Sequence, residues 1–215
     1  MATIEQNKER FINILRSIKR SGADIEGLIE KLEKSDFFTA PASSKFHANY
    51  EGGLCQHSLN VFDNLMMLCL NLTSDKGKVK PFDEDTIKIV ALLHDVSKMN
   101  FYETYVQNKK VYSANGSKYD EMGKYDWQAV KAYRVIDAED RFLYGNHEQT
   151  ADFIASYYIP LTVEEHVAIL NHMGGKGVDS AQTDLTPIYN RYPLAILLHS
   201  ADALATFIDE RIVNE

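Results

Sequence analysis

Only two cysteines occur among the 215 residues, and they do not form a Cys-x-x-Cys pair. Cys55 and Cys69 therefore do not fit a zinc finger or a dithiol redox site. Cys69 lies in the apolar stretch 65–70, which predicts a buried thiol. No apolar run is long enough to span a bilayer, and the sequence has no internal repeat or low-complexity segment. Because acidic residues and no apolar region follow the first methionine, we expect no signal peptide and a cytoplasmic location.

Positive charge is also in short supply. Lys and Arg total 23 against 31 Asp and Glu, which gives a formal net charge of −8. Nucleic-acid phosphates are bound by basic surfaces. This balance therefore argues against charge-driven binding along an extended stretch of DNA or RNA, although not against nucleotide substrates. The hydrophobic fraction of 45% and the charged fraction of 25% are ordinary for a soluble globular protein, and we therefore expect a chain that is mostly folded.

Helical periodicity covers most of the chain. Apolar residues at helical spacing predict helices over residues 4–18, 24–32, 54–72 and 83–94, and again from 146, from 162 to 173 and from 193 towards Val213. Predicted N-caps are Asp24, Asn146 with Gln149, and Thr162 with Glu165. The expected buried stripe of the third helix is His57, Val61, Leu65, Leu68 and Leu72. The fold class is therefore all-α, apart from the insertion described next.

Residues 101–140 differ in character from the rest. Alternating residues in 102–106 and 111–112 flank the polar stretch 107–110, which predicts a β-hairpin with its turn at 107–110. The following residues, rich in Tyr and Gly, are interpreted as irregular and partly extended. Their position makes this insertion a candidate wall or lid of a site.

The adjacent pair His94 and Asp95 follows the apolar run 87–93. A carboxylate and an imidazole next to a core segment are costly unless something compensates them, and a metal ion is the usual compensator. Single histidines on apolar faces usually only pack, so the hypothesis depends on the set. Three of the seven histidines, His57, His94 and His172, lie on or beside apolar helix faces, and His147 begins a helix.

Asp202 adds a second carboxylate among small and apolar residues. A metal ion would compensate it, and the alternatives are an ion pair or a helix-terminal hydrogen bond. Since consecutive helix positions point about 100° apart, His94 and Asp95 favour two ions, with the second Asp95 oxygen on a neighbouring ion and His147 and His172 beside it. Ligands without thiolate favour Mn, Fe, Ni, Co, Zn or Mg.

Lys98 follows Asp95 by three residues and lies on a nearby face. A cation beside a metal site is costly unless an anion binds there, which indicates a phosphate-bearing substrate. A solvated lysine at a helix C-terminus explains the same position equally well.

The ordered set His57, His94-Asp95 and Asp202 resembles the HD superfamily of metal-dependent phosphohydrolases. The similarity extends to the flanking strings Glu-Gly-Gly-Leu-Cys-Gln-His-Ser (51–58), Ala-Leu-Leu-His-Asp-Val-Ser-Lys (91–98) and His-Ser-Ala-Asp (199–202), and it spans about residues 37–210. The nearest likeness is to the HD domain of bacterial 3′-5′ exoribonucleases and to stand-alone phage or bacterial HD hydrolases. Because only 36 residues precede residue 37, we expect no oligonucleotide-binding barrel there, and the sequence lacks the Gly-Tyr-Pro element of cyclic-dinucleotide phosphodiesterases.

The resemblance implies an HD-domain helical bundle over residues 37–215, with a small β-hairpin insertion around 101–135. Residues 1–36 are expected to form a helical appendage packed on the core. The implied ligands of one ion are His57, His94, Asp95 and Asp202, and those of a second are Asp95, His147 and His172. A metal-bound water would attack phosphorus, with Asp95 and Lys98 as the catalytic residues and Lys98 on a phosphate oxygen.

Other histidines and one lysine are expected to act around the metal ligands. His47 and Lys45 precede the first ligand helix and are expected to contact substrate. His199 is expected beside the ligands or in packing, and His166 at the surface or in packing. The favoured function is hydrolysis of a nucleotide or another small phosphate ester. The alternatives are a nucleotide-sensing HD module without turnover and an exonuclease-like phosphodiesterase, and the sequence leaves the substrate and the oligomeric state open.

Overall fold

The computed structural model describes residues 2–174 and 184–211. Its helices are α1 (Ile4–Arg16), α2 (Ile25–Glu33), α3 (Gly53–Leu72), α4 (Glu84–Leu93), α5 (His147–Tyr158), α6 (Val163–Leu170), α7 (Thr186–Arg191) and α8 (Pro193–Leu204). The strands are β1 (Tyr102–Tyr112), β2 (Lys118–Asp120) and β3 (Gly123–Val135), and the short helical turns are η1 (Val96–Lys98), η2 (Ala138–Asp140) and the π-helix η3 (Ala205–Asp209). Half of the chain is helical, as the all-α prediction requires. The predicted helix end at Val213 lies outside the described residues.

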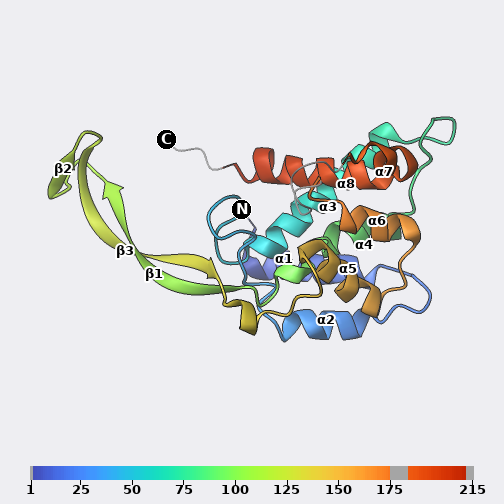
Figure 1. Ribbon diagram of the computed structural model, residues 1–215, viewed down its shortest axis with the longest axis horizontal. Helices are drawn as coiled ribbons and strands as arrows, with labels where there is room; N and C mark the ends of the chain where they lie inside the picture. Colours follow the sequence, from blue (N-terminus) through green and yellow to red (C-terminus); the bar gives the residue numbers. More distant parts are fainter. Residues whose placement is uncertain (1, 175–183, 212–215) are drawn as a thin grey trace.

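The helices form a single body around α3, which packs against both α4 and α8, while α6 packs against α8 (Figure 1). The predicted caps are present, because the side chains of Asp24, Asn146 and Thr162 each accept a hydrogen bond from the backbone three residues on. In the predicted stripe of α3, His57, Val61 and Leu65 are buried. Its last member, Leu72, is 61% exposed, so the stripe ends earlier than the periodicity predicts.

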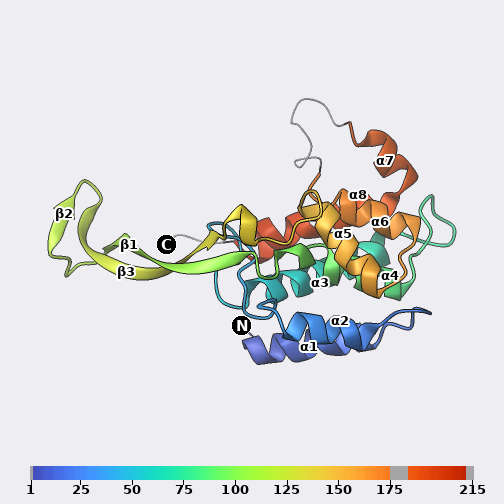
Figure 2. The ribbon, with the colours of Figure 1, turned by 60° about the horizontal axis from the view of Figure 1, so that its bottom comes forward.

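The two N-terminal helices lie side by side beneath the rest of the body (Figure 2). The ring of Phe11 on α1 lies 5.0 Å from Phe37 and 5.7 Å from Phe38, centroid to centroid. Side chains of α1 and α2 belong to the same hydrophobic core as those of α3, α4 and α8. The division of the chain into a helical appendage over residues 1–36 and an HD domain over residues 37–215 stays a prediction.

The insertion is an antiparallel sheet of strand order β1-β3-β2 that projects from the body as a long arm (Figure 1). The hairpin was predicted in the right place, but its predicted turn was wrong. Residues 107–110 lie in the middle of β1, where Asn108 pairs with Ala129. Because both faces of the arm meet solvent, polar residues occur along the strand and do not mark its end. The residues after Tyr112, which were expected to be irregular and partly extended, form strands β2 and β3.

Two helices end earlier than predicted. The sixth helix ends at Leu170 and not near Met173, so His172 lies in the turn that follows it. The fourth ends at Leu93, which places His94 at its C-cap and Asp95 beyond it, with φ −110° and ψ 14°. In the described part of the chain, no helix is both long and apolar enough to cross a membrane.

Candidate metal centre

Side chains from two helices and from the end of a third meet inside the body. His57 comes from α3, His94 from the end of α4 and Asp202 from α8. The Nε2 atoms of His57 and His94 are 3.4 Å apart, and His57 Nε2 is 3.2 Å from Asp202 Oδ1. One donor atom from each of the three residues lies within 4.8 Å of the other two, so the group can hold a metal ion.

Asp95 connects this group to a second one. Its Oδ2 is 3.6 Å from Nε2 of both His57 and His94, whereas its Oδ1 is 3.6 Å from His172 Nε2. His94, Asp95 and His172 form a second group of donor atoms within 4.8 Å, which shares His94 with the first, and His47, His57 and Glu210 form a third. The two oxygens therefore face different histidines. The expectation of two consecutive helical positions was wrong, because the helix ends before the pair and the freed backbone lets Asp95 turn towards His172.

Hydrogen bonds orient the imidazole rings of His57, His94 and His172 so that Nδ1 faces away from the cluster in each. His94 Nδ1 donates to the carbonyl of Ala91 at 2.8 Å, and His172 Nδ1 donates to that of Ile169 at 2.7 Å. His57 Nδ1 instead donates to a carboxylate oxygen of Glu210 at 3.0 Å. With Nδ1 engaged in each ring, Nε2 is the atom left for a metal ion, and it points into the cluster.

Glu210 was missed by the sequence interpretation. Its side chain is 2% exposed and also accepts a hydrogen bond from Asn60 Nδ2 at 2.9 Å. It follows the π-helix η3, in which the extra residue per turn changes which side chains face α3. Its spacing of eight residues from Asp202 is close to a helical repeat and was the one available signal.

Burial and charge oppose each other throughout the cluster. Burial alone would raise the pKa of Asp95, but Lys98 and the histidines hold it well below its usual value. Burial alone would lower the pKa of His57, but hydrogen bonds to Asp202 and Glu210 raise it to about 10. Burial lowers the pKa of His94 to about 4. The carboxylates of Asp95 and Asp202 thus stay ionised, with the charged Lys98 and His57 as neighbouring cations.

Two further observations concern the same centre. His172 Nε2 is a buried nitrogen with no hydrogen-bond partner among the described residues, as expected of a ligand atom. Lys98 Nζ donates to Asp95 Oδ2 at 2.7 Å, and its side chain is 16% exposed. The lysine is therefore an ion-pair partner of the central carboxylate and not a solvated helix-terminal residue.

The other predicted residues lie around this cluster. His147 is the first residue of α5, and its ring packs on Phe101 at 4.4 Å between centroids. It belongs to none of the donor groups found among the described residues, although its Nδ1 is buried without a partner there. The ring of His47 lies 4.9 Å from that of His57, and Lys45 is exposed on the same loop.

Two histidines lie outside the ligand cluster. His199 Nδ1 donates to the backbone carbonyl of His172 at 2.7 Å, so it supports the turn that carries a candidate ligand. His166 Nδ1 is 2.6 Å from Asp152 Oδ1 and is more than one-third exposed. Both positions agree with the supporting and surface roles expected of them.

A helical body with imidazoles and carboxylates gathered in its interior is a suitable scaffold for divalent metal ions. Comparison with known protein families matches the HD domain over residues 54–206, which is more than half of the chain. The chain therefore belongs to the HD domain family, and the resemblance to HD-superfamily phosphohydrolases is confirmed. HD domains bind divalent metals and are in general hydrolases. No curated protein and no solved structure matched the chain.

Proposed function

We propose that this protein is a metal-dependent phosphohydrolase that acts on a nucleotide or another small phosphate ester. The observation that carries the proposal is a pair of adjacent donor groups that share His94, with Asp95 between them and its two oxygens facing different histidines. Nitrogen and oxygen donors without thiolate suit Mn, Fe, Ni, Co, Zn or Mg. The buried Nε2 of His172, which has no hydrogen-bond partner in residues 2–174 and 184–211, fits the same interpretation.

The ligands of the first ion are proposed to be His57, His94, Asp95 and Asp202. Those of the second are Asp95, His172 and His147, of which His147 has the weaker structural support because it lies outside the compact groups. Divalent ions bound there supply an activated water and positive charge opposite the phosphoryl oxygens.

The chain's own cations complete the proposed substrate site. Burial alone would lower the pKa of Lys98, but Asp95 raises it above its usual value, so the ammonium stays charged at neutral pH. Lys98 is proposed to bind a phosphate oxygen and, while no substrate is bound, to neutralise part of the Asp95 charge. His47 and Lys45 are proposed to contact the rest of the substrate from the loop before α3.

The experiment combines metal analysis with a substrate panel. Protein purified without chelator is expected to carry about one to two equivalents of a divalent metal. Asp95→Ala is expected to lose that metal. The matched control is Asp152→Ala, which removes a carboxylate from a histidine contact at the surface and is expected to retain it.

Turnover is then measured on nucleoside monophosphates, cyclic nucleotides, p-nitrophenyl phosphate and bis-p-nitrophenyl phosphate, with Mn²⁺ or Ni²⁺ added. We expect hydrolysis of at least one ester, reduced on the order of 10²- to 10³-fold by Asp95→Ala. A metal-free protein whose Asp95→Ala variant is equally stable would contradict the proposal. Metal binding with tight nucleotide binding and no turnover would instead favour a sensor.

A further inference from the structure

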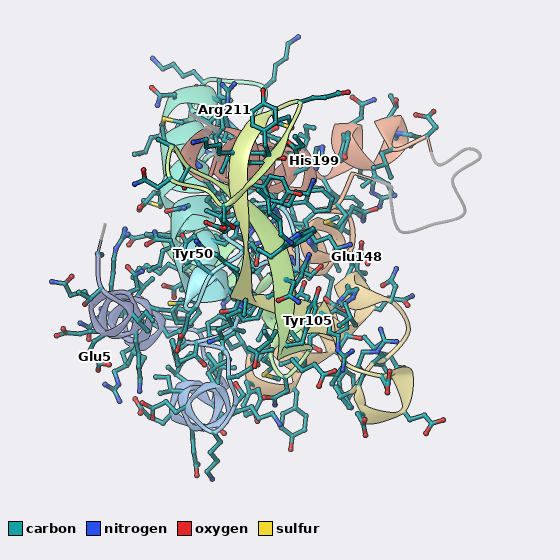
Figure 3. The ribbon with its side chains drawn as sticks, turned by 90° about the vertical axis from the view of Figure 1, so that its left-hand side faces the viewer. Glu5, Tyr50, Tyr105, Glu148, His199 and Arg211 are labelled. Atoms are coloured by element: carbon teal, nitrogen blue, oxygen red, sulfur yellow. The ribbon has the colours of Figure 1, made fainter. Side chains whose placement is uncertain are left out.

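The arm is the part of the molecule that the proposed metal centre does not explain. Strands β1 and β3 pair without interruption from Tyr102 with Val135 to Tyr112 with Tyr125. Ten residue steps at about 3.3 Å give a paired length of about 33 Å. Figure 3 looks at the molecule from the side of the arm, which carries the labelled Tyr105 and crosses in front of the helical body.

The strand register divides the side chains of the arm between two faces, because directly opposed residues share a face and successive residues alternate. One face, here called the aromatic face, consists of the pairs Tyr102–Val135, Thr104–Tyr133, Val106–Lys131, Asn108–Ala129, Lys110–Trp127 and Tyr112–Tyr125, with Lys118 of β2 opposite Tyr125. The opposite face consists of the pairs Glu103–Arg134, Tyr105–Ala132, Gln107–Val130, Lys109–Gln128 and Val111–Asp126. Five of the six aromatic residues in β1 and β3 thus share one face, and both carboxylates of these two strands lie on the other, whereas Asp120 of β2 lies on the aromatic face opposite Gly123.

Contacts between side chains agree with this division. On the aromatic face, Lys110 Nζ lies 4.4 Å from the ring centroid of Tyr125 and 5.8 Å from that of Trp127. On the opposite face, the Arg134 guanidinium lies 5.6 Å from the Tyr105 ring and binds Glu103 at 2.7 Å. The aromatic face therefore has ammonium groups beside rings at two places, Lys110 beside Tyr125 and Trp127, and Lys131 at 5.6 Å from the Tyr133 ring.

The arm also differs in charge from the rest of the chain. Residues 101–136 contain six Lys or Arg and four Asp or Glu, a net charge of +2. Since the whole chain carries −8, the remaining residues carry −10. The net acidity that argues against nucleic-acid binding is thus a property of the body, from which the arm projects (Figure 1). On β2, Asp120 pairs with Lys110 at 2.7 Å, whereas Lys118 forms no ion pair among the described residues.

The rings towards the tip of the arm are the most exposed, whereas Tyr133 near its base is buried. Tyr112 is 40% exposed, Trp127 is 51% exposed, and Tyr119 on β2 is 77% exposed. The residues of 102–135 contribute nothing to the hydrophobic core of the described chain. A two-stranded ribbon has no second layer to cover such rings, so they are available to a partner.

We propose that the aromatic face of the arm binds single-stranded nucleic acid. Exposed bases stack on Tyr and Trp rings, and neighbouring ammonium groups bind the backbone phosphates. A protein partner fits less well because lysine is depleted from protein interfaces, and this face presents Lys118 together with Lys110 and Lys131, which pair with Asp120 and Glu51. Duplex binding depends mainly on phosphate neutralisation, for which a net charge of +2 is small. The inference goes beyond the proposed function, because binding on the arm does not require turnover at the metal centre.

The experiment measures the fluorescence anisotropy of labelled single-stranded DNA and RNA of about 16 nucleotides. Phosphorothioate linkages protect the probe, and the full chain is used as purified without chelator. Trp127→Ala is expected to weaken binding by about fivefold or more, the loss of one stacked base. The matched control is Tyr105→Ala on the opposite face, for which we expect less than about a twofold change. Circular dichroism and metal content check that both variants fold.

A second pair of variants tests the charges. Lys118 and Lys124 are both exposed near the tip and lie on opposite faces. Lys118→Gln is expected to reduce the slope of log affinity against log salt by about 0.7, and Lys124→Gln to leave it unchanged. Equal effects of Trp127→Ala and Tyr105→Ala would overturn the proposal, as would the failure of the wild-type chain to bind either probe. A dimer that dissociates on Trp127→Ala without probe binding would identify a second copy as the partner and overturn it too.

Discussion

The helical body and the arm depart from the usual distribution of residues in opposite ways. The body buries charge, with His57 and His94 fully buried beside Asp95 and Lys98. The arm exposes aromatic rings such as Trp127 in a ribbon without a second layer. Each arrangement is unfavourable for the chain alone. The two proposals account for both departures, because a bound cation would compensate the buried charge and a single-stranded nucleic acid would cover the exposed rings.

The two regions are also stabilised differently. Paired strands and exposed ion pairs hold the arm, whereas a continuous core and buried polar contacts hold the body. Arg20 shows the second kind of contact, because its guanidinium binds both carboxylate oxygens of Glu165, at 2.7 Å and 2.9 Å. The Glu165 side chain is completely buried. This pair joins the N-terminal helices to α6 across 145 residues of sequence.

The largest effect is expected from breaking this contact. Arg20→Met leaves the Glu165 carboxylate buried with the hydroxyl of Thr86 and the Thr162 N–H as its remaining partners. The free energy of unfolding should fall by about 3 kcal/mol, measured by urea denaturation at neutral pH. The control is Arg16→Met, which breaks the exposed pair with Glu26 and should cost about 1 kcal/mol or less. Equal losses of unfolding free energy in Arg20→Met and Arg16→Met would show that the buried ion pair stabilises the protein no more than the exposed one.

The difference in unfolding free energy between the wild type and Arg20→Met should also depend on pH. Burial alone would raise the pKa of Glu165, but its hydrogen bonds, first that from Arg20, lower it from the usual value of 4.5. A lowered folded-state pKa stabilises the protein above pH 4.5, and this contribution disappears as the pH falls through the folded-state value. The stability difference between the wild type and Arg20→Met should therefore be full at neutral pH and narrow below pH 4.5. A difference that widens in acid would contradict this role of Glu165.

The next effect concerns the carboxylate behind His57. Glu210→Gln keeps an oxygen that can accept the His57 Nδ1–H bond but removes the negative charge that makes the ring a better ligand. Metal affinity, measured by calorimetry with Mn²⁺ or by Co²⁺ absorption, should fall about 10- to 100-fold while the fold is retained. The neighbouring Asp209→Asn, at an exposed contact with Asn64, is the control and should change little. Unchanged affinity in Glu210→Gln would limit Glu210 to packing.

Features set by nearby residues were predictable from the sequence. The caps at Asp24, Asn146 and Thr162 depend on side chains that reach three residues along the chain, and all three were confirmed. Membership of the HD domain family followed from ordered motifs and was also confirmed. The ligand roles and the likeness to exoribonucleases stay predictions, because no finding tests them.

Features set by distant parts of the chain were not predictable. Glu210 meets His57 across 153 residues, and that contact depends on the π-helix η3, which apolar periodicity does not reveal. The hairpin turn was misplaced because polarity marks a turn only where one strand face is buried, and both faces of this arm meet solvent. The end of α4 at Leu93 was missed because the apolar pattern continues to Val96, although the helix does not.

The smallest effect on the stability of the body is expected from shortening the arm. Tyr105 pairs with Ala132, so joining these two residues through an Asn-Gly turn removes residues 106–131 and keeps the base of the ribbon. Because the removed residues contribute nothing to the core among the described residues and form only the exposed pair of Lys131 with Glu51 towards the body, the free energy of unfolding should change by less than about 1 kcal/mol. Metal content and hydrolysis of p-nitrophenyl phosphate should stay at the level of the full chain, while binding of single-stranded oligonucleotides should be lost. A body that unfolds or loses its metal without the arm would mean that the two regions are one structural unit, and the contrast between buried charge and exposed rings would then have to be explained by a contact that joins them.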